Sequence, residues 1–129
     1  MLHQELTGTI IKAALAVHNK LGYGFLEKVY HNAMLIELKK QGLTAESEKS
    51  IKVFYDGQEI GDYFADIIVN NKVIVEIKAI KELLAVHETQ LVNYLKATDI
   101  NVGLLLNFGP SMAFKRKIFE KAQSLPKNT

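Results

Sequence analysis

The stretch Phe64-Ala65-Asp66-Ile67-Ile68-Val69-Asn70-Asn71-Lys72-Val73-Ile74-Val75-Glu76-Ile77-Lys78 decides the fold. Two apolar runs flank a pair of asparagines, and because asparagine tolerates positive φ this pattern predicts two antiparallel strands, 60–69 and 72–79, joined by a turn. Both strands carry charges on apolar faces: Asp66 in the first, Glu76 and Lys78 in the second. A buried charge is costly unless it is paired or binds a metal, so these residues need an explanation.

The two acids can act together only if they point to the same face of the sheet. Directly opposed residues of an antiparallel pair share a face, and a one-residue slip turns every side chain over. A two-residue loop would place Asp66 and Glu76 on opposite faces. A three-residue loop over 70–72, or a bulge in one strand, would bring them together. We predict the loop, with Val69 opposite Val73 and Asn71 or Lys72 in the left-handed region, asparagine being the easier choice.

Hydrophobic periodicity predicts the other elements. Apolar residues at helical spacing mark the predicted helices, which are 6–21, 25–41, 86–97 and a last basic one, 112–122. Alternation or a short apolar run marks the predicted strands, which are 50–55, 60–69, 72–79 and 101–107. The order ααβββαβα indicates an α/β fold, a mixed central sheet of about four strands flanked by helices. We expect residues 1–129 to form a single domain with a frayed tail from about residue 124.

Composition narrows the classes of function. The chain has 129 residues, 48% hydrophobic and 23% charged, as is ordinary for a globular protein. It has no cysteine, which excludes disulfides and thiolate metal sites. It also has neither a long apolar run nor a signal-like start, so we expect no membrane partner and a cytoplasmic location. The net charge of +2 is only a weak indication of a nucleic-acid partner.

The charged residues of the two strands suggest metal chemistry. The carboxylates of Asp66 and Glu76, with the backbone carbonyl of Ile77, offer the hard oxygen ligands that Mg²⁺ or Mn²⁺ prefers. Such an ion activates water and offsets charge on a phosphate, while Lys78 can hold the water or stabilise the transition state. The alternative is a simple ion pair between Glu76 and Lys78. The strand that carries these two residues does not by itself decide between the ion pair and a metal site. The acid on the neighbouring strand favours the metal site.

Several segments resemble a known family. Asp66 followed after nine residues by Glu76-Ile77-Lys78 is similar to the PD-(D/E)XK nuclease signature, although no proline precedes the aspartate. The segment 24–30, Gly-Phe-Leu-Glu-Lys-Val-Tyr, resembles the namesake motif of the GxxExxY proteins, a branch of that superfamily. Further similar segments bring the resemblance to residues 5–120, and they are 17–22, 90–95 and 104–109. The resemblance implies a restriction-endonuclease-like core and a nuclease ancestry.

The resemblance also implies roles for residues on two helices. Glu27 would be an additional acid that reaches the metal directly or through water, whereas composition alone favours an exposed acid stabilised by the helix dipole. Gln90 and Tyr94, with His87 three residues earlier, share a helix face and look like the QxxxY element that borders the site and touches substrate. The alternative for these three is a polar stripe on a solvated helix.

Other candidates favour structural roles. Tyr30 lies on an apolar stripe, which favours core packing. His18 could be a metal ligand, as in some related nucleases, but a lone histidine beside an apolar face more often packs. Lys115 and Arg116 belong to a basic run that could contact phosphates or simply form a solvated face.

Three functions compete at this point. The first is metal-dependent phosphodiester hydrolysis of DNA, or of RNA. The second is a non-catalytic nucleic-acid-binding or assembly module on the same fold. The third is a structural or interaction protein that forms a homodimer. The enzyme is favoured because every catalytic candidate is present: Glu27, Asp66, Glu76, Lys78 and Gln90.

Overall fold

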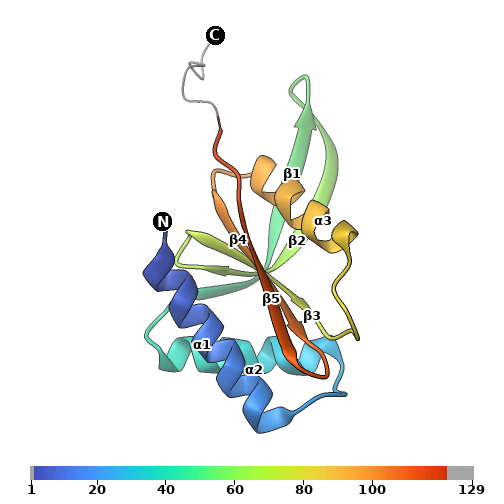
Figure 1. The fold of residues 1–129 in the computed structure, drawn as a ribbon. Helices are drawn as coiled ribbons and strands as arrows, with labels where there is room; N and C mark the ends of the chain where they lie inside the picture. Colours follow the sequence, from blue (N-terminus) through green and yellow to red (C-terminus); the bar gives the residue numbers. More distant parts are fainter. Residues whose placement is uncertain (1, 122–129) are drawn as a thin grey trace.

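The computed structural model describes residues 2–121 and places a five-stranded mixed sheet between helices (Figure 1). The helices are α1 (Gln4–Leu21), α2 (Glu27–Lys40) and α3 (Ala85–Lys96). The strands are β1 (Ala45–Tyr55), β2 (Gln58–Val69), β3 (Val73–Lys78), β4 (Val102–Phe108) and β5 (Met112–Ile118). They lie in chain order across the sheet, all antiparallel except the pair β3–β4, which α3 connects. The predicted mixed α/β fold is confirmed, with one strand more than expected.

The helices divide between the two faces of the sheet. On β4, Leu104 and Leu106 pack with α1 and α2 on what we call the helix-pair face. Leu105, between them, packs on the opposite α3 face. Gly103 allows α3 to lie close to that face, because an added Cβ would come within 2.7 Å of the Leu91 side chain. Alternation along single strands therefore supplies both hydrophobic layers.

The predicted register of β2 and β3 is confirmed. Val69 lies opposite Val73, so the loop contains three residues. Asn70 and Asn71 both have positive φ, at 52° and 55°, and the Lys72 N–H donates to the Val69 carbonyl at 2.9 Å. The prediction of a type I turn followed by one left-handed residue differs from this geometry. Two consecutive left-handed residues occur in turns whose twist suits a hairpin.

The predicted last helix is wrong. Residues 112–118 form β5, which pairs antiparallel with β4, and the rest of the predicted helix beyond residue 121, like the predicted frayed tail, lies outside the described residues. Lysine and arginine favour helices, but the backbone groups of the buried β4 need a partner strand, and this tertiary demand outweighs propensity. A basic edge strand also resists pairing with another chain. β1 likewise starts earlier than predicted, at Ala45.

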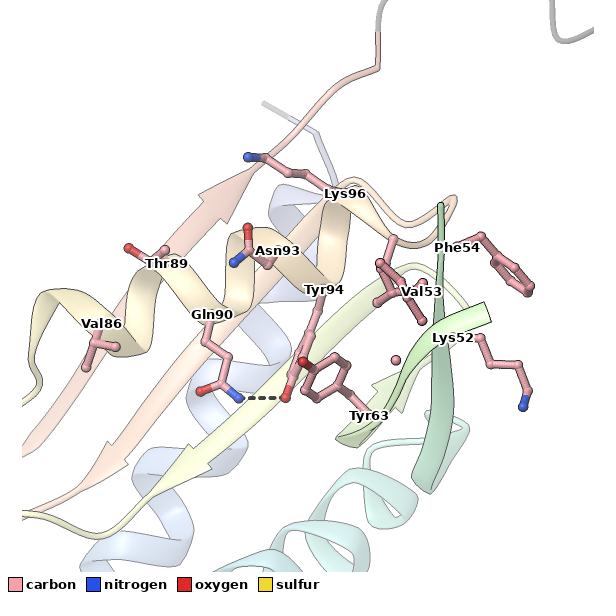
Figure 2. A pocket seen from close by; sticks show the side chains of 13 residues that line it. Lys52, Val53, Phe54, Tyr63, Val86, Thr89, Gln90, Asn93, Tyr94 and Lys96 are labelled. Atoms are coloured by element: carbon pink, nitrogen blue, oxygen red, sulfur yellow. Dashed lines mark hydrogen bonds between the residues drawn. The ribbon is translucent and has the colours of Figure 1, made fainter. Parts of the chain in front are cut away.

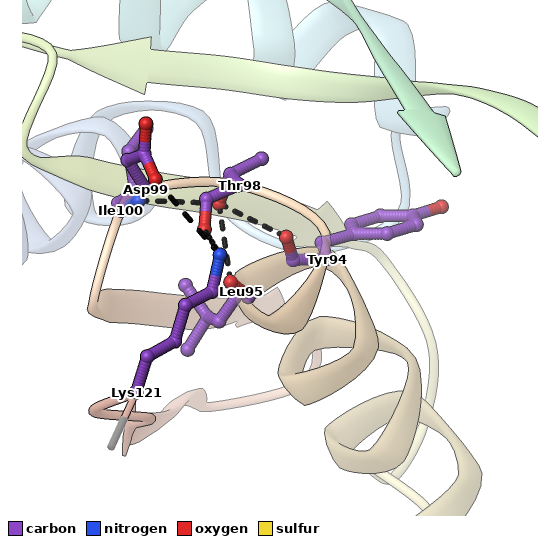
Figure 3. Close-up of polar contacts among 6 residues, drawn as sticks. All are labelled: Tyr94, Leu95, Thr98, Asp99, Ile100 and Lys121. Atoms are coloured by element: carbon purple, nitrogen blue, oxygen red, sulfur yellow. Dashed lines mark hydrogen bonds and ion pairs between the residues drawn. The ribbon is translucent and has the colours of Figure 1, made fainter. Parts of the chain in front are cut away.

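The carboxyl end of α3 is held by a small polar network (Figure 3). The Thr98 hydroxyl lies 3.0 Å from the carbonyl of Tyr94 and 3.3 Å from that of Leu95. Lys121 donates to the Thr98 carbonyl at 2.6 Å. The Thr98 hydroxyl thus satisfies carbonyls that the helix end leaves without partners, and Lys121 holds the turn that follows α3. Within residues 2–121, no helix is both long and apolar enough to cross a membrane.

Candidate functional site

A cavity of about 130 Å³ lies on the α3 face of the sheet. It gathers every residue predicted to be catalytic, together with two predicted to bind substrate. Its lining is Glu27, Phe64, Asp66, Glu76, Lys78, His87, Gln90, Tyr94 and Leu105. Four separate elements, α2, β2, β3 and α3, thus direct the predicted residues to one place.

The regular pairing of β2 with β3 ends at the cavity. Their last paired residues are Ile67 and Val75, and one step further along this register Asp66 comes opposite Glu76. There the Asp66 carboxylate accepts a hydrogen bond from the Ile77 N–H at 2.7 Å. A strand residue directs its N–H and C=O to the same neighbour, so the carbonyl of Ile77 also lies on the side of Asp66, as a backbone ligand would require.

Glu76 is the most perturbed acid of the site. Its side chain is buried, and its Oε1 atom has no hydrogen-bond partner. Burial raises the pKa of Glu76 to about 9, with the neighbouring Asp66 carboxylate adding to the shift and Lys78 opposing it. A buried carboxyl with an orphaned oxygen beside a second carboxylate is stabilised by either a proton or a cation.

The donor set fits a hard divalent cation. Two carboxylates and a backbone carbonyl offer only oxygen atoms, the ligands that Mg²⁺ and Mn²⁺ favour, with water completing the shell. No three histidine, aspartate or glutamate side chains converge as a metal cluster within the described part of the chain. Glu27 lines the same cavity as Asp66 and Glu76.

Tyr30 explains how Glu27 is positioned. The Tyr30 hydroxyl donates to the Gly22 carbonyl at 2.6 Å and accepts from the Phe25 N–H at 3.3 Å. Its fully buried ring stacks on Phe108 at a centroid distance of 4.7 Å. Tyr30 thus anchors the loop that precedes α2, and Glu27 is the first residue of that helix. This is the packing role that the sequence favoured.

The α3 residues form a linked group (Figure 2). Gln90 Nε2 donates to the Tyr94 hydroxyl at 2.7 Å. Burial raises the pKa of Tyr94; the Gln90 hydrogen bond opposes this, and Glu76 and Asp66 add to it. The phenol is therefore within electrostatic reach of both acids, and it remains protonated as a donor near neutral pH.

His87 has a second function besides lining the cavity. Its Nδ1 accepts a hydrogen bond from the Leu84 N–H at 3.0 Å, at the amino end of α3. An imidazole nitrogen that accepts from a backbone N–H is not available to substrate, which leaves Nε2 for any other contact. His87 is thus partly engaged in holding the helix that carries Gln90.

His18 and Arg116 lie on the opposite face of the sheet from the cavity. His18 Nε2 donates to the Gly109 carbonyl at 2.8 Å, and α1, which carries this residue, covers the helix-pair face. His18 therefore has the packing role that we favoured. Arg116 donates to the carbonyl of Leu2 and lies opposite Leu104, also on the helix-pair face. The expectation that Arg116 contacts substrate at this cavity is not met, because the basic run is a strand whose side chains alternate between faces.

Lys115 lies on the correct face but outside the cavity lining. In the sheet register, Glu76 lies beside Leu105, and Leu105 lies beside Lys115. One strand therefore separates the lysine from the buried acid, a distance of about 10 Å across the sheet. Lys115 can contact a phosphate that extends beyond the cavity, but it does not belong to the cluster of acids.

Asn107 is a positioning residue that sequence reasoning missed. It is 2% exposed and pairs with the backbone of Ile80, donating at 2.9 Å and accepting at 3.0 Å. In the β3–β4 register it lies opposite Lys78, so it fixes the segment that leaves the site. Gly109 permits this approach, because an added Cβ would lie 2.6 Å from the Ile80 carbonyl. An amide inside an otherwise apolar strand was the available signal.

Comparisons with known proteins agree with this architecture. A solved structure titled "Crystal structure of SSO0001" matches with a TM-score of 0.60 and 23% sequence identity. The match covers 76% of this chain and 52% of the other, so the chain spans about half the length of SSO0001; this likeness concerns the fold alone. No curated protein matches the sequence. The family model of the PD-(D/E)XK nuclease superfamily matches residues 4–119. The chain therefore belongs to the PD-(D/E)XK nuclease superfamily.

Proposed function

We propose that this protein is a divalent-metal-dependent nuclease that hydrolyses phosphodiester bonds of DNA, with RNA as the alternative substrate. The observation that carries the proposal is the pair of carboxylates, Asp66 and Glu76, held on one face with the Glu76 Oε1 buried and unpartnered. With the Ile77 carbonyl, these acids would hold Mg²⁺ or Mn²⁺. The bound ion would supply an activated water and neutralise charge on the phosphate.

The remaining cavity residues have complementary chemistry. An ammonium cannot ligate a cation, so Lys78 would donate to the attacking water or to a phosphate oxygen. Gln90 orients the Tyr94 hydroxyl, which can donate to a phosphate because its high pKa keeps it protonated. Glu27 would act through water at the rim of the cavity.

Metal binding and cleavage test the proposal together. We expect Mn²⁺ to bind in calorimetric titration, and labelled single- and double-stranded oligonucleotides to be degraded only with Mg²⁺ or Mn²⁺. Glu76→Ala should abolish both. Glu82→Ala is the matched control, because Glu82 is an exposed acid in the segment between β3 and α3 and does not line the cavity. Equal Mn²⁺ binding by the wild type and Glu76→Ala would refute the assignment of the site.

A second function, a non-catalytic nucleic-acid-binding module, is favoured by one observation. No group of three or more histidine, aspartate or glutamate side chains that could hold a metal is found among residues 2–121, so the acidic ligand set at Asp66 and Glu76 is sparse for a catalytic cation. Oligonucleotide binding without turnover at any Mg²⁺ or Mn²⁺ concentration would support this alternative over the enzyme.

A further inference from the structure

A second and larger groove, of about 760 Å³, adjoins the cavity. It lies between α3 and the hairpin of β1 and β2 (Figure 2). Gln90 and Tyr94 line both the groove and the cavity of acids, so the two hollows meet at this pair. A ligand lying in the groove would therefore reach the proposed metal site.

The walls of the groove offer aromatic faces. Tyr63 is 49% exposed and its ring lies 5.8 Å from that of Tyr94, centroid to centroid. Ile60 and Val86 extend the apolar surface, and both are more than half exposed. The ring of Phe54 lies on the other side of β1 and points away from Tyr63 (Figure 2). An exposed ring in a concave apolar surface is unusual for a solvated face and is suited to stacking on flat apolar groups.

The charge of the groove suits an anionic ligand. Its described lining contains two lysines, Lys52 and Lys96, and no acidic side chain. Lys52 lies 3.1 Å from Glu59 and 3.9 Å from Asp62, whereas Lys96 has no ion-pair partner among residues 2–121. Lys96 lies in the last turn of α3, and its ammonium lies 5.7 Å from the centroid of the Phe119 ring, which is outside the groove lining.

We propose that this groove binds single-stranded nucleic acid, with an unpaired base stacking on Tyr63 and the backbone leading past Gln90 and Tyr94. Stacking requires an open base face, which a duplex hides within its own stack, and every base offers such a face regardless of sequence. The destination of the strand rests on the proposed nuclease function, whereas binding in the groove does not. A protein partner, including a second copy of this chain, would not need a groove that leads into the cavity of acids.

Binding measured without metal separates this proposal from the nuclease function. The probes are fluorescein-labelled oligo-dT and oligo-rU of about 12 nucleotides, within the usual site sizes of single-strand grooves, and a blunt duplex of the same length. Anisotropy titrations in EDTA compare the wild type with Tyr63→Ala and the ring-preserving Tyr63→Phe. Tyr55→Ala is the matched control, since Tyr55 is an exposed tyrosine of the same hairpin that does not line the groove.

We expect the wild type to prefer at least one single strand over the duplex. Tyr63→Ala should weaken that binding about tenfold, within the range for the loss of one stacked base. Tyr63→Phe and Tyr55→Ala should bind like the wild type, and all variants should keep the thermal midpoint of unfolding within a few degrees. No single-strand binding, equal weakening on the duplex, or a groove variant that merely converts a dimer to a monomer would overturn the proposal. Binding without any Mn²⁺-dependent cleavage would refute only the nuclease function, and cleavage of single strands unaffected by Tyr63→Ala would refute only the groove.

Discussion

The two faces of the sheet use the same strands for different purposes. On the helix-pair face, α1 and α2 together cover a continuous apolar layer that includes Val75, Leu104 and Leu106. On the α3 face, a single helix of 12 residues covers a smaller layer and leaves Asp66 and Glu76 at a cavity. The difference shows that stability and chemistry occupy alternate positions of the same strands. Changes on one face should therefore leave the function of the other largely intact.

The largest effect is expected from emptying the helix-pair face. Leu106→Ala removes a fully buried side chain and should destabilise the protein by about 2–5 kcal/mol, measured by denaturant unfolding. Mn²⁺ affinity should change little in the protein that remains folded. Leu105→Ala is the partner experiment, because the adjacent leucine lines the cavity and should alter Mn²⁺ binding as well as stability. Equal effects of both variants on the metal would contradict the separation of the two faces.

A comparably large effect, but on turnover, is expected from Lys78→Ala. Removal of one donor to developing charge lowers kcat about 10²–10³-fold in well-studied enzymes, which corresponds to about 3–4 kcal/mol. Calorimetry should show Mn²⁺ binding close to that of the wild type, because the ammonium is not a ligand. Lys81→Ala, an exposed lysine that does not line the cavity, serves as the control. Lost Mn²⁺ affinity with unchanged turnover would contradict this role.

The pH dependence of stability tests the cost of the buried acid. The pKa of Glu76 is raised from 4.5 to about 9, so the folded state keeps a proton that the unfolded chain has lost over this interval. Its contribution to stability is therefore fully present below pH 4.5 and is lost as the pH rises toward 9, by at most about 1.4 kcal/mol per pH unit. In EDTA, Glu76→Gln should flatten this slope and be the more stable protein at pH 8. Parallel curves for the two proteins would contradict it.

A smaller effect is expected from the anchor before α2. Tyr30→Phe removes the hydrogen bonds to Gly22 and Phe25 while keeping the ring, so it should destabilise the protein by about 1 kcal/mol. Because the loop positions Glu27, any Mn²⁺-dependent cleavage should also fall modestly. Tyr23→Phe, at an exposed position of the same loop, is the control. An unchanged midpoint in urea for Tyr30→Phe would show that the anchor is not needed.

Sequence patterns were sufficient where a local rule had a single solution. The demand that two acids share a face allowed only an odd loop or a bulge, and the observed pairing of Val69 with Val73 follows from it. They were insufficient for residues 112–118, because lysine-rich segments suit a helix surface and an edge strand equally well. Because a helix was predicted there, the face of the sheet on which Arg116 lies could not be predicted.

The sequence by itself determined the alternation of core and polar positions, the glycines that follow α1 and α2, and the acids that stand out from apolar strands. Those features are local, since they depend on single residues or on periods of two or about 3.6 residues. Only the tertiary structure decided that β4 takes β5 as a partner, that Asn107 binds the backbone of the segment after Lys78, and that Glu27 reaches the cavity. Each of these depends on which distant backbone needs a partner and how closely two elements approach, and no residue's own propensity encodes that.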